Sequence, residues 1–84
     1  MVTVKLFGTL RLDSGIKELS VSAGVVKDLL PLIAAEMKKI DPSLDITVKD
    51  LKGCIMSVNN RQVTLKTKLN DGDVLFMLPA VGGG

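Results

Sequence analysis

An unbroken run of apolar residues, VLFML at positions 74–78, lies near the end of this 84-residue chain. A strand that is apolar at every position usually has both faces of its sheet covered. Residues 26–40 repeat apolar side chains at helical spacing, and this is the only segment that predicts a helix. One helix covers only one face of a sheet. The sequence therefore predicts that the other face carries an exposed apolar patch, formed by Phe7 and alternate residues of 74–78, which another protein covers.

Shorter segments with the alternation of half-buried strands lie on either side of the helix. The expected strands are residues 2–6, 16–21, 54–58, 62–65 and 74–78. The first two are expected to form a β-hairpin, and turns are expected at 59–60 and 70–73. This order predicts an α+β fold with a mixed sheet of four to five strands and one main helix packed on one face, which is the β-grasp pattern.

Two details of this fold stay open in the sequence. Pro31 disfavours a helix interior, so the helix begins either with Asp28 as its cap or near Gly24 with a kink. The Asp-Pro pair at 41–42 ends the helix in either case. The polar connection that follows, up to residue 53, is either a loop or a loop interrupted by a short edge strand at 44–48.

The composition argues against several classes of function. Basic and acidic residues are interspersed, the net charge is +2, and the aromatic residues are two Phe, so a nucleic-acid surface with stacking platforms is not expected. The chain has no His, which is the usual general acid or base at neutral pH, so we expect no enzyme activity of its own. No apolar run approaches a membrane span, and the start does not resemble a signal peptide, so we expect a cytoplasmic protein without membrane contact.

Cys54 is the only cysteine, which excludes an intramolecular disulfide and a four-thiolate metal site. We expect no metal site, and we expect Cys54 to be a small buried hydrophobic residue rather than a nucleophile. Met56 and Met77 fit either the core or a surface that contacts a partner.

The carboxyl end of the chain, NDGDVLFMLPAVGGG at 70–84, is similar to that of the MoaD/ThiS family of ubiquitin-like sulfur carriers. The opening VKLFGTLR at 4–11 and the VNN turn at 58–60 also resemble this family, so the likeness covers nearly the whole chain. The pattern is closest to the MoaD branch. Ala80 and Gly82, however, stand where molybdopterin-related members often have Pro and either Ala or Ser.

The resemblance implies that function resides in the carboxylate of Gly84. A MoeB/ThiF-like activating enzyme would use ATP to adenylate it, and sulfur would then convert it to a thiocarboxylate, with no cofactor bound to this chain. Gly82 and Gly83 would let the tail thread through a narrow channel. The implied pathway is molybdopterin synthesis with a MoaE-like catalytic large subunit. Alternatives are a ubiquitin-like modifier that forms isopeptides with lysines, or a carrier for cysteine, thiamine or tRNA thiolation.

The expected division of the chain is a β-grasp domain at 1–81 and a flexible glycine tail at 82–84. We expect this tail to be mobile, because glycines lose the most conformational entropy on ordering. The residues expected to contact partner proteins are Phe7, Arg11, Phe76, Leu78, Pro79 and Val81.

Overall fold

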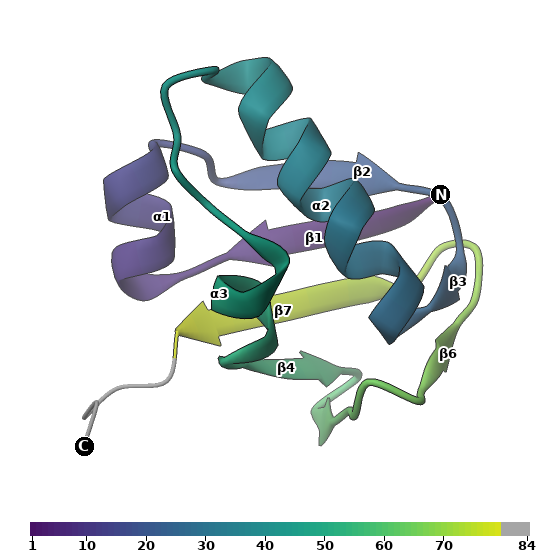
Figure 1. Cartoon of the computed structure of the whole chain (residues 1–84). Coiled ribbons are helices and arrows are strands. Elements are labelled where there is room, and N and C mark those ends of the chain that lie inside the picture. Colours follow the sequence, from purple (N-terminus) through teal and green to yellow (C-terminus); the bar gives the residue numbers. More distant parts are fainter. Residues whose placement is uncertain (80–84) are drawn as a thin grey trace.

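A mixed sheet forms the centre of the structure, a computed structural model that describes residues 1–79 (Figure 1). Its five strands lie in the order β2-β1-β7-β4-β5. β1 and β7 are parallel, whereas the other neighbours are antiparallel. The strands are β1 (Val2–Leu6), β2 (Glu18–Val21), β4 (Cys54–Val58), β5 (Arg61–Gln62) and β7 (Val74–Pro79). Two further short strands, β3 (Gly24–Val25) and β6 (Lys68–Leu69), pair with each other beside this sheet. The predicted β-grasp architecture is confirmed.

Helix α2 (Val26–Ile40) lies across one face of the sheet, as predicted (Figure 1). Its apolar side is buried against the inward-facing side chains of the strands. The largest contributors to this core are Leu6, Leu29, Leu30, Ile33, Met37, Leu51, Leu69, Leu75 and Met77, each at most 1% exposed. Met56 is also buried, so both methionines left open by the sequence belong to the core.

The start of α2 is fixed by backbone contacts and not by a side-chain cap. The N–H of Val26 donates to the carbonyl of Thr67 at 2.8 Å, and the N–H of Lys27 donates to the carbonyl of Leu65 at 2.9 Å. These bonds satisfy donors that a helix start otherwise leaves without partners. The alternative in which Asp28 caps the helix is therefore wrong. Pro31 lies inside the helix, where its ring is exposed.

The connection between the first two strands contains a helix that the sequence analysis missed. β1 and β2 do pair antiparallel, but α1 (Gly8–Ser14) occupies the expected hairpin turn (Figure 1). Gly15 ends α1 in the left-handed conformation, with φ at 71°, and its N–H donates to the carbonyl of Arg11 at 2.8 Å. α1 buries none of its residues completely, so its apolar periodicity is weak.

The alternating residues at 44–48 do not form an edge strand. Residues 44–47 are irregular, and the chain then forms α3 (Val48–Lys52). Thr47 and Asp50 make a capping box, in which the Thr47 Oγ1 accepts from the Asp50 N–H at 3.3 Å and an Asp50 carboxylate oxygen accepts from the Thr47 N–H at 3.0 Å. These two bonds satisfy the first turn locally, which favours a helix over strand pairing at this position.

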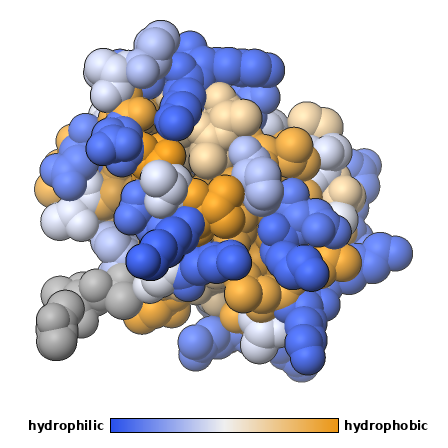
Figure 2. Space-filling view, viewed as in Figure 1, coloured by the Kyte–Doolittle hydropathy of each residue, from blue (hydrophilic) through white to orange (hydrophobic). Residues whose placement is uncertain are grey.

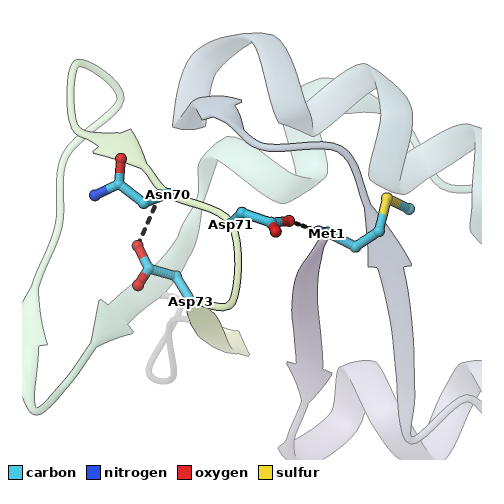
Figure 3. A network of polar contacts seen from close by, with 4 residues as sticks. All are labelled: Met1, Asn70, Asp71 and Asp73. Atoms are coloured by element: carbon cyan, nitrogen blue, oxygen red, sulfur yellow. Dashed lines mark hydrogen bonds and ion pairs between the residues drawn. The ribbon is translucent and has the colours of Figure 1, made fainter.

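The two predicted turns are confirmed. Asn59 and Asn60 both have positive φ, at 53° and 65°, and connect β4 to β5. The turn between β6 and β7 is tied to the start of β1, because the Met1 ammonium group pairs with the Asp71 carboxylate (Figure 3). The N–H of Gly72 also donates to the Met1 carbonyl at 3.0 Å. These contacts hold the start of β7 beside β1.

Candidate functional site: the outer sheet face and the base of the tail

Successive side chains of β7 alternate between the two faces of the sheet. Leu75 and Met77 point toward α2 and are fully buried. Phe76 is half-buried on the opposite face, and Leu78 is 40% exposed there. No helix among the described residues covers this second face. The prediction of an exposed apolar surface on it is confirmed.

Four side chains, Phe7, Ile55, Phe76 and Leu78, form this surface, which we call the sheet-face patch. The rings of Phe7 and Phe76 are in contact, with centroids 5.6 Å apart and planes inclined at 36°. Ile55 lies opposite Leu78 in the β4–β7 pair and is 45% exposed. Together with Ser57 and Asn60, the patch lines a shallow hollow of about 450 Å³.

Ile55 was not among the predicted contact residues. The signal for it was available in the sequence, because Met56 and Val58 share one parity of the expected strand at 54–58. Both are buried, which places Ile55 on the outer face. The parity of residues 54–58 therefore predicts an outward-facing Ile55 in the same way as the parity of residues 74–78 predicts an outward-facing Phe76.

The beginning of α1 packs closely against the end of β7. Gly8 has φ at +60°, and a Cβ at this position would lie 3.3 Å from the Leu78 Cδ1 and 3.4 Å from the Pro79 ring. The N–H of Phe7 donates to the Met77 carbonyl at 3.0 Å. Glycine therefore allows α1 to approach the last residues of β7 and to fix their position.

Basic side chains lie at one side of the sheet-face patch. Lys5, Arg11 and Lys17 line a hollow of about 240 Å³ together with Phe7, Phe76 and the acidic Glu18. Within residues 1–79, none of these three cations forms an ion pair. Arg11 belongs to α1 and is exposed. Its contact with a partner remains a prediction.

Cys54 lies at the first position of β4, opposite Pro79 in β7. Its side chain is half-buried and packs against the core, so it is less enclosed than predicted. Burial raises the pKa of the Cys54 thiol, and the nearby Asp50 carboxylate raises it further. Both effects disfavour the thiolate, which is the nucleophilic form. The environment therefore agrees with the expectation that Cys54 is not a nucleophile.

The remaining predicted site residues, Val81, Gly82, Gly83 and Gly84, lie outside the described residues, as does the predicted mobility of the tail. Predictions for these positions stay predictions. Within residues 1–79, no group of three or more His, Cys, Asp or Glu side chains is arranged to hold a metal ion. None of the described helices is long and apolar enough to cross a membrane.

Comparison with known proteins places this geometry among small carrier and modifier proteins. The ThiS family matches residues 4–84. A chain in the BexX/CysO complex from Amycolatopsis orientalis is similar in structure, with a TM-score of 0.70, 28% identity and full coverage of both chains. So is the small archaeal modifier protein 1 from Methanosarcina acetivorans, with a TM-score of 0.70, 28% identity and coverage of 99% of this chain and 95% of that chain.

A third similar structure is a chain in the complex of subunits 1 and 2 of the molybdopterin-converting factor from Helicobacter pylori 26695. The TM-score is 0.58 at 28% identity, with 99% of this chain and 97% of that chain covered. No curated protein sequence matches this chain significantly.

Proposed function

We propose, since this chain belongs to the ThiS family of ubiquitin-like carrier proteins, that it is a sulfur carrier whose reactive group is the carboxylate of Gly84. In this proposal the chain catalyses nothing itself. It is the protein substrate of an ATP-dependent activating enzyme and afterwards the sulfur donor of a second partner. ATP binds to the activating enzyme, and this chain needs no cofactor.

The chemistry requires activation because a carboxylate is a poor electrophile. A Gly84 carboxylate oxygen attacks the α-phosphorus of ATP, and pyrophosphate leaves. A sulfur nucleophile at the oxidation level of sulfide then attacks the acyl carbon, AMP leaves, and a thiocarboxylate results. The three terminal glycines suit this role, because residues without a Cβ pass through a narrow channel and adopt φ values denied to others.

The observation that carries the proposal is the position of the sheet-face patch relative to the end of β7. β7 ends at Pro79, directly after Leu78, which belongs to the patch. A partner that covers the patch is therefore placed at the point where the last five residues begin. Buried aromatic side chains commonly provide much of the binding energy at such interfaces, and Phe7 and Phe76 supply two.

For the pathway, we propose molybdopterin synthesis with a MoaE-like catalytic large subunit as the acceptor of the thiocarboxylated chain. Supporting this choice is the similarity to a chain of the Helicobacter pylori molybdopterin-converting factor, which is a complex of two subunits. The similarity to a chain of the BexX/CysO complex and to an archaeal modifier protein favours two alternatives, another sulfur-transfer pathway or isopeptide formation. All of these share the acyl adenylate as their first intermediate.

The activation step is tested by ATP–pyrophosphate exchange with a cognate activating enzyme, followed by intact-mass measurement in the presence of a sulfur donor. We expect one oxygen to be replaced by one sulfur. One alanine appended after Gly84 should abolish exchange, because it moves the carboxylate away from its position in the enzyme. Cys54→Ala serves as the matched control and should still be adenylated and thiolated. Exchange at the wild-type rate by the extended chain would refute the proposal.

The pathway is tested separately with the thiocarboxylated chain. Sulfur delivery to the pterin precursor, in the presence of a catalytic large subunit, supports the molybdopterin assignment. Attachment of the chain to lysines of larger proteins, seen by mass spectrometry after tryptic digestion, supports the modifier alternative. Sulfur transfer to a different acceptor changes the pathway and leaves the carrier mechanism in place.

A further inference from the structure

A second hollow lies on the other side of the tail base, on the helix-bearing face of the sheet. It measures about 340 Å³ and lies between α1, residues 44–46, α3 and the end of β7. Pro79 and Cys54 form its end nearest the tail. We call it the tail-base groove. It does not overlap the sheet-face patch, because Pro79 and Leu78 point to opposite faces of the sheet.

The floor of the tail-base groove is apolar and partly exposed. It is formed by Leu10 of α1, Met37 of α2, and Leu44 and Ile46 of the irregular segment before α3. Leu10, Leu44 and Ile46 pack against the core but keep part of their surface accessible. Figure 2, which looks onto the helix-bearing face, shows such apolar surface between hydrophilic side chains. The floor can therefore receive aliphatic side chains.

Asp45 and Ile46, which line the groove, have backbone groups without hydrogen-bond partners in the described part of the chain. The N–H groups of Asp45 and Ile46 make no hydrogen bond within residues 1–79, and neither do their carbonyls. Leu44 and Ile46 point into the groove floor, while Asp45 between them is exposed, so the side chains alternate as in a strand. A stretch of this kind can pair with an added extended segment, whose main-chain hydrogen bonds contribute affinity.

The rim of the groove is negatively charged. Asp13, Asp45 and Asp50 lie around it and are exposed, and the described residues that line it include neither Lys nor Arg. Asp50 is engaged in the capping box, whereas Asp13 and Asp45 form no ion pair within residues 1–79. The raised pKa of the Cys54 thiol, to which Asp50 contributes, agrees with a negative potential in the groove.

We propose that the tail-base groove binds a short extended segment of a partner protein in which basic residues alternate with aliphatic ones. The aliphatic side chains contact the floor, the backbone pairs with residues 44–46, and the basic side chains face Asp13 and Asp45. The chain's own last five residues are a poor occupant, because in the proposed function they end in a carboxylate that the rim repels. That this partner is also the protein that binds the tail rests on the proposed function. The rest of the proposal does not depend on it.

Binding is tested by titrating the full-length, ¹⁵N-labelled chain with an acetylated and amidated peptide of sequence Lys-Val-Lys-Val-Lys. We expect amide shifts in residues 44–46, at Leu10 and Asp13, and at Cys54, and we expect them to decrease with added salt. The same peptide with Glu in place of Lys should cause none. The double variant Asp13→Asn, Asp45→Asn should weaken the peptide about fivefold.

A matched control variant, Asp28→Asn with Glu36→Gln, changes the net charge equally on exposed or half-exposed positions of α2 outside the groove, and should bind like the wild type. Absence of shifts, shifts centred on the sheet-face patch, or equal weakening by both double variants would overturn the inference. So would contacts between the chain's own tail and the groove in the free protein. Because no activating enzyme takes part, peptide binding without adenylation refutes only the proposed function, and adenylation without peptide binding refutes only this inference.

Discussion

Replacing Gly8 by Ala tests whether the start of α1 positions the base of the tail. Gly8 is the first residue of α1 and Gly15 follows its last, and both have left-handed backbone conformations, with φ at +60° and +71°. They differ in their surroundings. A Cβ at Gly8 would lie 3.3 Å from the Leu78 Cδ1, whereas a Cβ at Gly15 would meet nothing within 4 Å. Gly15→Ala is therefore a matched control that carries the backbone strain without the contact.

The expected loss in the free energy of unfolding follows from the backbone strain and from the contact with Leu78. An alanine in the left-handed region costs ~1–2 kcal/mol, and the reduced entropy of the unfolded chain offsets ~0.4–1 kcal/mol, so Gly15→Ala should destabilise by about 1 kcal/mol. Gly8→Ala adds a crowded contact, for which overpacking costs typically ~1–3 kcal/mol. Leu78 is 40% exposed and can move away, so the lower end applies. Gly8→Ala should therefore cost about 2 kcal/mol in total.

Urea unfolding followed by far-ultraviolet circular dichroism measures both variants, since the chain has no Trp for fluorescence. A difference of about 1 kcal/mol between them corresponds to about 4–8 °C in Tm for a domain of this size. Adenylation by the activating enzyme should fall for Gly8→Ala, because Leu78 and Pro79 are displaced, and should be unchanged for Gly15→Ala. Equal destabilisation by the two variants, or equal adenylation, would refute the argument that this contact positions the tail base.

Three further predictions concern other parts of the molecule. Phe76→Ala should leave the chain folded but weaken binding to the activating enzyme or the large subunit by about tenfold or more, as is usual for aromatic hot spots. Unchanged affinity in a calorimetric titration would contradict the role of the sheet-face patch. Thr47→Val removes the hydroxyl of the α3 capping box and should lower the free energy of unfolding by about 1 kcal/mol in urea, whereas no loss would mean that the cap contributes nothing. Because the pKa of its thiol is raised, Cys54 should react with iodoacetamide more slowly than a free thiol at neutral pH, and its rate should increase as the pH rises past the usual thiol range. The stability that depends on the neutral thiol should be lost over the same rise in pH. A free-thiol rate at pH 7 would contradict both expectations.

The main features of the fold were predictable because they depend on periodicity. The helix over 26–40 and the apolar strand at 74–78 were recognised from patterns that arise from burial, and the structure buries these same residues. The exposed outer face was predictable because the sequence shows one amphipathic helix, and a single helix cannot cover both sides of a sheet. The turns at 59–60 and 70–73 followed from residue types that tolerate left-handed or tight conformations.

The features that could not be predicted from the sequence are the contacts between distant segments and the short helices. The first N–H groups of α2 donate to the carbonyls of Leu65 and Thr67, which lie about forty residues further along the chain, so no local pattern identifies the start of this helix. α1 has no fully buried side chain, and α3 has only Leu51, so neither shows a recognisable apolar face. The alternation at 44–48 does not mark a strand of the sheet, because Leu44 and Ile46 form part of the floor of the tail-base groove and Val48 begins α3.

The base of the tail is the point where these features meet. β7 is held by the parallel pair with β1 as far as Met77 and by the antiparallel pair with β4 as far as Pro79. Leu78 and Pro79 are therefore positioned by β4 on one side and by the close approach of Gly8. Their side chains point to opposite faces, one into the sheet-face patch and the other into the tail-base groove. A partner that contacts both surfaces would hold the chain on two sides of the same strand. It would thereby determine the direction in which the last five residues leave the domain, and under the proposed function this direction decides whether the terminal carboxylate reaches the active site of the activating enzyme.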